Sequence, residues 1–268
     1  MCLVMMLVAV PLMANLKMHG PDFHNKEAAV EGPRVRVLLA SGVNSVLLEA
    51  KGPYRVERYD TGGFLSAGLV GKRYVTHCTD NGLRWGEEFP QIVAFTVVPS
   101  APQTRFFVNG FQYSGTITVG TDRAGQLIVI NETPIEDFVK SVLAAKYPRA
   151  MSKEAAAALA IIERTRIFAH VMEGLESSRT WDVTASESGY YGYGVTRSAC
   201  AIDRAVDDTP FMVVQSRNGK VGSADLNLPL GKAMELAQKG CDARRILSQC
   251  FPQTTLGLTA EPTHSRVR

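Results

Sequence analysis

The sequence predicts an α+β fold in which an antiparallel, strand-rich first half precedes a helical second half. Three observations support this expectation. Short β-branched runs fill the chain from Arg34 to Ile130, helical periodicity replaces them from Thr133, and 268 residues suffice for one large or two small domains. Hydrophobic residues make up 46% and charged residues 21% of the chain, which is ordinary for a globular protein and excludes a disordered chain or a coiled coil.

Turn signals divide the strand-rich region into short runs. Thr and Gly alternate with Ile and Val in Tyr113–Val119, which predicts a strand with one buried face. An antiparallel sheet or a small barrel is therefore expected. The expected strands are Arg34–Ala40, Asn44–Ala50, Tyr54–Tyr59, Gln91–Val98, Arg105–Val108, Gln112–Val119 and Gln126–Ile130.

The change of period at Thr133 predicts the first helix. The residues from Thr133 to Glu136 have the sequence of a capping box with Pro at the first helical position, and Pro148 should end the helix. A second helix is expected after Ser152, running to about Met172 because Gly174 follows. Further along, Leu230–Lys239 and Asp242–Gln249 are expected as short helices, and the polar tail Thr254–Arg268 is expected to fray.

Residues 1–16 carry no charge and are expected to form a signal peptide. The apolar run Leu3–Met13 is long enough for the core of such a peptide and too short for a membrane span, which needs about 20 residues. No basic residue precedes it, so a buried N-terminal segment or an early start codon stays an alternative. The protein is expected to be exported to the periplasm or cell envelope, and to contact the membrane only through an uncleaved signal.

Composition and motif spacing argue against several other function classes. The formal net charge of +3 is too small to indicate a nucleic-acid partner. The five cysteines show no CxxC spacing and the five histidines are dispersed, so neither a metal nor a cofactor is expected. Cys241 and Cys250 bracket one expected helix and would stand about 13 Å apart, beyond disulfide distance.

An aromatic, glycine-rich segment lies between Thr180 and Arg197. Flat rings stack on the apolar face of a pyranose, and glycines let the backbone approach it closely, so the segment has the composition of a sugar-binding surface. A hairpin whose tyrosine rings cover the helices would explain it equally well. The rings concerned are Trp181, Tyr190, Tyr191 and Tyr193.

Residues 131–148, with the sequence NETPIEDFVKSVLAAKYP, resemble the signature of the stage II sporulation protein D family, which includes the amidase-enhancer (LytB) proteins. That signature is Asn-Glu-x-Pro-x-Glu-Asp-aromatic, a short helix and a Glu-Met-Pro-type turn, and it aligns without a gap. The similarity continues through the Ala-rich stretch to Arg164-Thr165 and, more weakly, over Phe111–Val119 and Leu228–Leu256. It implies a domain of this family at 111–256, while the strand pattern predicts a β-rich region at 30–120 and the polar composition of the chain's end predicts a flexible tail at 257–268.

The resemblance implies an envelope protein that acts on peptidoglycan. Some members are lytic transglycosylases that cleave peptide-stripped glycan strands with a single Glu, and others activate amidases. Lys146 stands at the position of that Glu. An ammonium with an ordinary pKa of about 10.4 is a poor donor to the glycosidic oxygen, and its charge opposes the oxocarbenium-like centre.

Other family features are also missing. The Cys/His-bearing segment has no counterpart in Thr184–Gly189, the later Ser-x-Cys-Gly-Gly and His-Gly-Val-Gly patterns are absent, and the span from Val214 to Leu228 is short. We therefore expect a protein that binds peptidoglycan glycan strands during wall remodelling or division, with lost or altered catalysis. The candidate glycan-binding residues are Lys146, Tyr147, Arg164, Trp181, Tyr190, Tyr191 and Tyr193.

Two alternatives stay open at this stage. The first is an active lytic transglycosylase whose acid has moved to Glu132, Glu163 or Glu187, although a Glu in a helix is more often a solvated surface residue. A carboxyl buried in the floor of the cleft would favour this alternative. The second is a non-catalytic activator or scaffold of a cell-wall amidase, without affinity for glycan.

Overall fold

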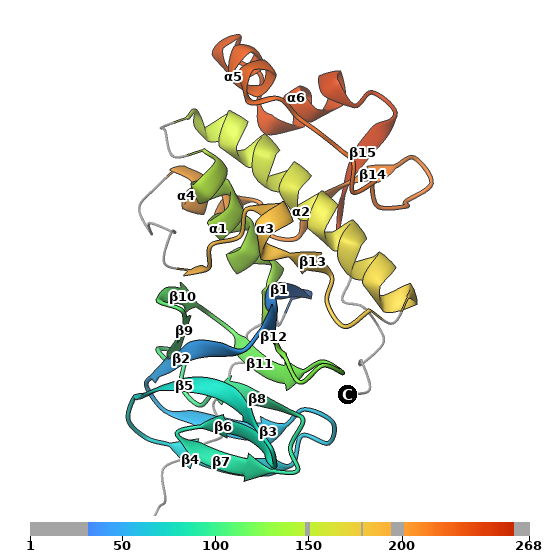
Figure 1. Cartoon of the computed structure of the whole chain (residues 1–268). Coiled ribbons are helices and arrows are strands. Elements are labelled where there is room, and N and C mark those ends of the chain that lie inside the picture. Colours follow the sequence, from blue (N-terminus) through green and yellow to red (C-terminus); the bar gives the residue numbers. More distant parts are fainter. Residues whose placement is uncertain (1–31, 148–150, 178, 194–200, 260–268) are drawn as a thin grey trace, which may run out of the picture. The chain divides into compact units, whose positions relative to one another are not determined.

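The computed structural model describes residues 32–147, 151–177, 179–193 and 201–259, and it confirms the α+β class (Figure 1). The expected signal peptide at 1–16, the expected helix stop at Pro148 and residues 260–268 of the expected tail lie outside the described residues.

A seven-stranded sheet connects the strand-rich region to the helices. Its order is β13-β1-β12-β11-β8-β3-β4, and every neighbouring pair is antiparallel except β1 and β13. The strands are β1 (Arg34–Val43), β3 (Tyr54–Arg58), β4 (Phe64–Gly68), β8 (Ala94–Pro99), β11 (Thr116–Thr121), β12 (Leu127–Pro134) and β13 (Val183–Thr184).

A second, six-stranded sheet packs against the first. Trp85 of this sheet is fully buried, stacks on Phe95 of the first sheet with ring centroids 6.4 Å apart, and donates its indole N–H to the Leu48 carbonyl at 2.9 Å. The order is β10-β9-β2-β5-β6-β7. The strands are β2 (Ser45–Lys51), β5 (Lys72–Thr79), β6 (Gly82–Trp85), β7 (Glu87–Pro90), β9 (Arg105–Val108) and β10 (Phe111–Tyr113).

Strands β4 to β7 have no counterpart in the sequence prediction. The sequence of β5, KRYVTHCT, does not alternate between polar and apolar residues, and only one residue of this strand is buried. These strands depend on pairing with partners such as β2 and β3 and not on a local pattern.

Helix α1 (Ile135–Lys146) follows β12 directly, and the predicted capping box is wrong. Thr133 is still part of the β1–β12 ladder, opposite Val35, and its hydroxyl contacts Ser114 Oγ at 3.0 Å. Pro134 is the N-cap residue and provides no side-chain bond. Thr133 therefore belongs to a strand, although the local sequence pattern predicts it as the cap of the helix.

Helix α2 (Lys153–Glu176) begins after Ser152 as predicted, since the Ser152 hydroxyl accepts from the Ala155 N–H at 3.3 Å. The predicted stop at Met172 is wrong. Gly174 lies inside the helix against Asp182, and a Cβ there would stand 2.4 Å from the Asp182 carboxylate. This glycine therefore permits a close contact and does not end the helix.

The remaining elements surround α2 (Figure 1). The two short helices expected near the C-terminus are confirmed, but part of the tail expected to fray pairs as a strand with Met212–Ser216. The elements are α3 (Ala185–Ser188), α4 (Ala201–Asp208), β14 (Met212–Ser216), α5 (Leu230–Gln238), α6 (Ala243–Cys250) and β15 (Thr254–Leu258).

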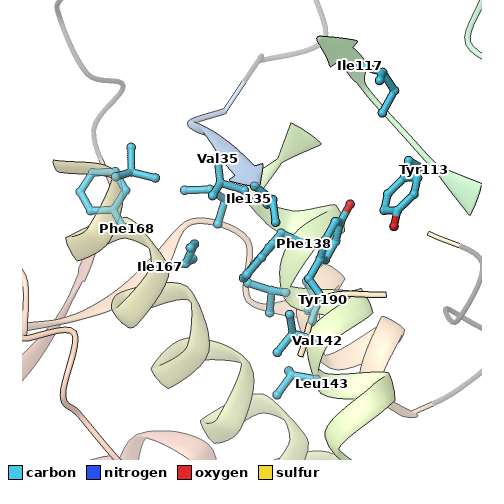
Figure 2. Packing of buried hydrophobic residues seen from close by; sticks show 14 of the residues in the cluster. Val35, Tyr113, Ile117, Ile135, Phe138, Val142, Leu143, Ile167, Phe168 and Tyr190 are labelled. Atoms are coloured by element: carbon cyan, nitrogen blue, oxygen red, sulfur yellow. The ribbon is translucent and has the colours of Figure 1, made fainter. Parts of the chain in front are cut away.

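One hydrophobic core runs from the sheets into the helices. Figure 2 shows Val35 of β1 beside Ile135 and Phe138 of α1, with Ile167 of α2 close by. The described residues from Gly32 onward form one compact unit, and strands on both sides of residue 120 belong to the same sheet. The boundaries 30–120 and 111–256 stay a prediction.

Candidate functional site

A pocket of about 370 Å³ is lined by α1, α2, α3, β13 and the segment before β13. Helix α2 provides much of one wall, because Glu163, Arg166 and His170 recur at helical spacing and share one face. Lys146, the last residue of α1, lines the same wall.

An ion pair between α1 and α2 dominates this wall. Lys146 Nζ lies 3.2 Å from each carboxylate oxygen of Glu163, and Arg166 Nη1 lies 3.3 Å from Glu163 Oε2. The Glu163 side chain is only 11% exposed, whereas those of Lys146 and Arg166 are 32% and 37% exposed. Arg166 also donates through Nε to the Ala224 carbonyl at 2.9 Å, so the Glu163 carboxylate is shared by two cations, one of which has a second anchor.

The opposite wall is attached to β1. Asp182 is buried and accepts from the Arg36 guanidinium at 2.9 Å and from the Arg36 N–H at 2.8 Å. β13 follows, paired in parallel with β1. Thr184 caps α3 by accepting from the Glu187 N–H at 3.2 Å, and its hydroxyl donates to Glu187 Oε2 at 2.7 Å.

Four of the residues predicted from sequence line this pocket: Lys146, Glu163, Trp181 and Glu187. Glu163 is therefore a buried carboxyl beside Lys146, where the resemblance expects the family acid, and this is the arrangement that the displaced-acid alternative requires. Tyr147 lies next to the pair, and burial together with the charge of Glu163 raises its pKa. Glu132 lies elsewhere, on β12, in an ion pair with Arg34 at 3.1 Å.

Arg164 does not line the pocket. Its side chain is 1% exposed, and its Nε and Nη2 donate to the Glu136 carboxylate at 2.8 and 2.7 Å. It also donates to the Met212 carbonyl at 3.1 Å. The prediction that Arg164 contacts glycan is therefore replaced by a role inside the protein, where it joins α1, α2 and β14.

The tyrosine-rich segment packs on the protein and not on the pocket. Tyr190 is 3% exposed, donates from its hydroxyl to Asn131 Oδ1 at 2.8 Å, and stacks on Phe138 with centroids 5.1 Å apart (Figure 2). Burial raises its pKa. Tyr190 is thus a core residue and not a glycan-stacking one.

The neighbouring rings contact the second sheet. Tyr191 is half-exposed beside Phe111, with centroids 6.4 Å apart, and Arg105 lies over the Tyr193 ring at 4.9 Å. The alternative in which these rings cover structural elements describes them better than a sugar-binding loop does. Trp181 alone among the predicted aromatic residues lines the pocket.

Arg166, His170 and Arg179 line the pocket and were not predicted from sequence. The first two could have been found, because they follow Glu163 at intervals of three and four residues along one helix. Arg179 gives no local signal, since its placement depends on the pairing of β13 with β1.

Two further observations concern the described residues. They contain no group of three or more His, Cys, Asp or Glu side chains arranged to hold a metal ion. Within the same residues, no helix combines the length and hydropathy that crossing a membrane would need.

Comparison with known proteins identifies relatives of this chain. Residues 123–215 match the model of the family described as Stage II sporulation protein (SpoIID), a range that contains α1, α2, β13 and α3. Uncharacterized proteins of Chlamydia muridarum and Chlamydia pneumoniae are each 36% identical over 230 residues, covering 86% of this chain and 79% and 83% of theirs. An uncharacterized protein of Brachyspira hyodysenteriae is 25% identical over 189 residues, covering 70% of this chain and 49% of its own. No solved structure matches at a significant level.

Proposed function

Because this chain belongs to the stage II sporulation protein (SpoIID) family, whose domain implies a cell-wall function, we propose that it is an exported protein that binds peptidoglycan glycan strands without cleaving them. The pocket between α1, α2 and β13 is the proposed binding site. The uncharged apolar N-terminal sequence supports export.

The Lys146–Glu163 ion pair carries the proposal. Cleavage needs a neutral acid that gives a proton to the glycosidic oxygen while positive charge develops on the sugar. At this position the chain has an ammonium whose protons point at both oxygens of a buried carboxylate. The ammonium would also repel the developing charge, so the site lacks the properties that the reaction requires.

The same pocket has features that suit sugar binding. Its volume of about 370 Å³ falls within the usual range for small-ligand sites. The partly buried ring of Trp181 offers a surface for the apolar face of a pyranose, and Thr184 and Glu187 offer polar groups for hydroxyls.

Displaced catalysis by Glu163 is the second candidate, favoured by the burial of this carboxyl in the pocket wall. Against it, both oxygens of Glu163 accept hydrogen bonds from cations, and a carboxylate that only accepts has no proton to give. Glu163 could act as the acid only after Lys146 and Arg166 had moved away.

Peptide-stripped glycan strands provide the test. We expect the purified protein to retain them in a pull-down and mass spectrometry to find no anhydro-muramyl ends. If the wild type does produce such ends, and they are lost in Glu163→Gln but kept in the matched variant Glu132→Gln, the proposal is overturned in favour of displaced catalysis. If the protein does not retain the strands, the proposal of glycan binding is contradicted. If it also enhances the turnover of a cell-wall amidase, a role as an amidase activator is favoured.

A further inference from the structure

The connection between β4 and β5 exposes two adjacent aliphatic side chains. It leads from the first sheet to the second, and its residues 69–71 have the sequence Leu-Val-Gly (Figure 1). Leu69 is 85% and Val70 is 78% exposed. Single apolar residues on a surface are ordinary, but these two are adjacent, and the half-exposed Tyr74 and Val75 follow them on β5. We call Leu69 and Val70 the apolar turn, and all four residues the apolar patch.

Two glycines hold the apolar turn against the sheets. A Cβ on Gly68 would stand 2.5 Å from the ring of Tyr54, and a Cβ on Gly71 would stand 2.9 Å from the Ala50 carbonyl oxygen. Any side chain at these two positions would therefore force the backbone away from β2 and β3. Because the chain packs closely on both sides of the turn, the apolar side chains are exposed on a backbone that is already in place.

Exposed basic residues lie beside the apolar turn. Lys51 ends β2 next to the carbonyl that Gly71 approaches, and Arg73 lies opposite Glu49 in the register of β2 and β5. Both cations pair with the single carboxylate of Glu49, Lys51 at 3.6 Å and Arg73 at 3.7 Å. No acidic residue occurs between residues 61 and 79. One positive charge of this group is therefore left without a compensating carboxylate.

The other charges near the turn do not cancel this excess. Lys72 pairs with Glu87 at 2.7 Å, and Arg55 pairs with Glu57 at 3.2 Å, so each of these two pairs is neutral. Arg105, which β9 places opposite the last residue of β2, donates to backbone carbonyls and adds a further cation. The surface beside the apolar turn is therefore basic.

An anionic bilayer is the partner that this combination fits. Aliphatic side chains enter the boundary between headgroups and acyl chains, tyrosine rings lie at the level of the headgroups, and basic residues are attracted to anionic lipid. A second copy of the chain or another protein fits less well. A stable protein interface takes about 20–30 residues from each partner, whereas the apolar patch has four.

We propose that the apolar turn inserts into the surface of a membrane that contains anionic lipid, with Lys51 and Arg73 against the headgroups. The sequence alone predicts membrane contact only through an uncleaved signal, and the apolar turn adds a second contact. No residue of the apolar patch lines the pocket between α1, α2 and β13. The proposal therefore does not depend on glycan binding, and either one can fail without the other.

A tryptophan in the turn reports insertion. Full-length Leu69→Trp is mixed with vesicles of phosphatidylcholine and about 30% phosphatidylglycerol whose acyl chains carry bromine, which quenches indole fluorescence on contact. We expect more quenching than in the wild type. The matched control is Val93→Trp, an exposed aliphatic position before β8 at the opposite end of the first sheet, which should show no added quenching. Both variants have the same N-terminal sequence, so a difference between them comes from the turn.

Removal of charge tests the role of the basic residues. Arg73→Gln, added to Leu69→Trp, is expected to raise the lipid concentration for half-maximal quenching about five-fold. Arg244→Gln, an exposed substitution on α6, is the matched control and should leave this concentration unchanged. Raising the salt concentration from about 0.1 M to about 1 M should weaken binding as well, because the attraction to the headgroups is then screened.

Three outcomes would overturn the proposal. The first is that Leu69→Trp shows no added quenching, or no more than Val93→Trp. The second is that vesicles of phosphatidylcholine alone quench equally well, or that Arg73→Gln has no effect, since anionic lipid would then not be selected. The third is a wild-type dimer in sedimentation that Leu69→Ser dissociates, because a second copy would then cover the turn. Since the substituted aliphatic residues are exposed, all variants should unfold at the wild-type temperature.

Discussion

Lys146 Nζ at the end of α1 lies 3.2 Å from both carboxylate oxygens of Glu163 in the middle of α2. The ion pair places a carboxylate beside Lys146, to which the resemblance assigns the family's acid position, but this carboxylate is bound by cations. Under the proposed function this contact distinguishes a binding site from a cleaving one, and a single substitution at Lys146 tests it.

Lys146→Glu is expected to create cleavage of peptide-stripped glycan. Two facing carboxyls repel when both are ionised, so the pair should hold a proton that a solvated carboxyl would release. A positioned general acid accelerates such reactions by about 10²–10⁴-fold. Anhydro-muramyl ends counted by mass spectrometry should therefore rise at least about 100-fold above the background count obtained with the wild type.

Two matched variants control this experiment. Lys146→Gln removes the ammonium without supplying an acid, and Lys153→Glu makes the same charge change at an exposed lysine paired with Asp208. Neither should cleave. A folded Lys146→Glu variant that binds glycan and leaves it intact would show that more than the acid is missing.

Arg164→Met is expected to destabilise the protein by about 3–5 kcal/mol. The substitution removes the buried guanidinium from the Met212 carbonyl and from the Glu136 carboxylate, which then keeps only the Phe211 N–H as a donor. The matched change Arg34→Gln breaks a pair whose side chains are 30% and 36% exposed, and should cost about 1 kcal/mol or less. Urea unfolding measures both, and equal losses would contradict the structural role assigned to Arg164.

Local signals in the sequence predicted those elements whose ends depend on nearby residues. Ser152 caps α2 as expected, because a cap needs only its own first turn, whereas Asp242, expected as the first helical residue, is the cap of α6. Thr133 fits a cap equally well, yet it lies in a strand, since pairing with β1 satisfies its backbone. Gly174 likewise depends on Asp182, a distant partner that no local pattern contains.

The candidate site was predictable in some of its residues but not in its contacts. Helical spacing and the family resemblance single out Lys146 and Glu163 separately, whereas their pairing depends on how α1 packs on α2. The aromatic composition was informative for Trp181 and misleading for Tyr190, because a glycine-punctuated tyrosine can stack on the core as readily as on a ligand.

Alkaline pH is expected to destabilise the protein partly through Tyr113. Burial raises the pKa of this tyrosine from 10.0 to about 12. Between these values the unfolded chain releases the proton while the folded chain keeps it, so the contribution of Tyr113 is complete below pH 10 and is lost as the pH rises toward 12. Relative to Tyr113→Phe, the wild type should lose about 1.4 kcal/mol of unfolding free energy between pH 9 and pH 11.

Urea unfolding at pH 9, 10 and 11 measures this difference directly, since other alkaline titrations occur in both proteins. Tyr59→Phe removes the same hydroxyl from a ring that is 38% exposed and is the matched control. A constant difference between wild type and Tyr113→Phe across this range would show that the phenol is not buried in solution.

Gly174→Ala is expected to destabilise the protein by about 3 kcal/mol although alanine is the better helix former. The added methyl would stand 2.4 Å from Asp182 Oδ1 and would push this buried carboxylate away from Arg36. Gly231→Ala, on α5, meets nothing within 4 Å and should leave stability unchanged or raise it by up to about 1 kcal/mol.

The Asp182 side chain also fixes the segment that carries Arg179 and Trp181. Gly174→Ala should therefore weaken glycan retention at temperatures where the variant is still folded, whereas Gly231→Ala should not. Calorimetric unfolding and the pull-down measure the two effects, and a Gly174→Ala protein as stable and as retentive as wild type would rule out this anchor.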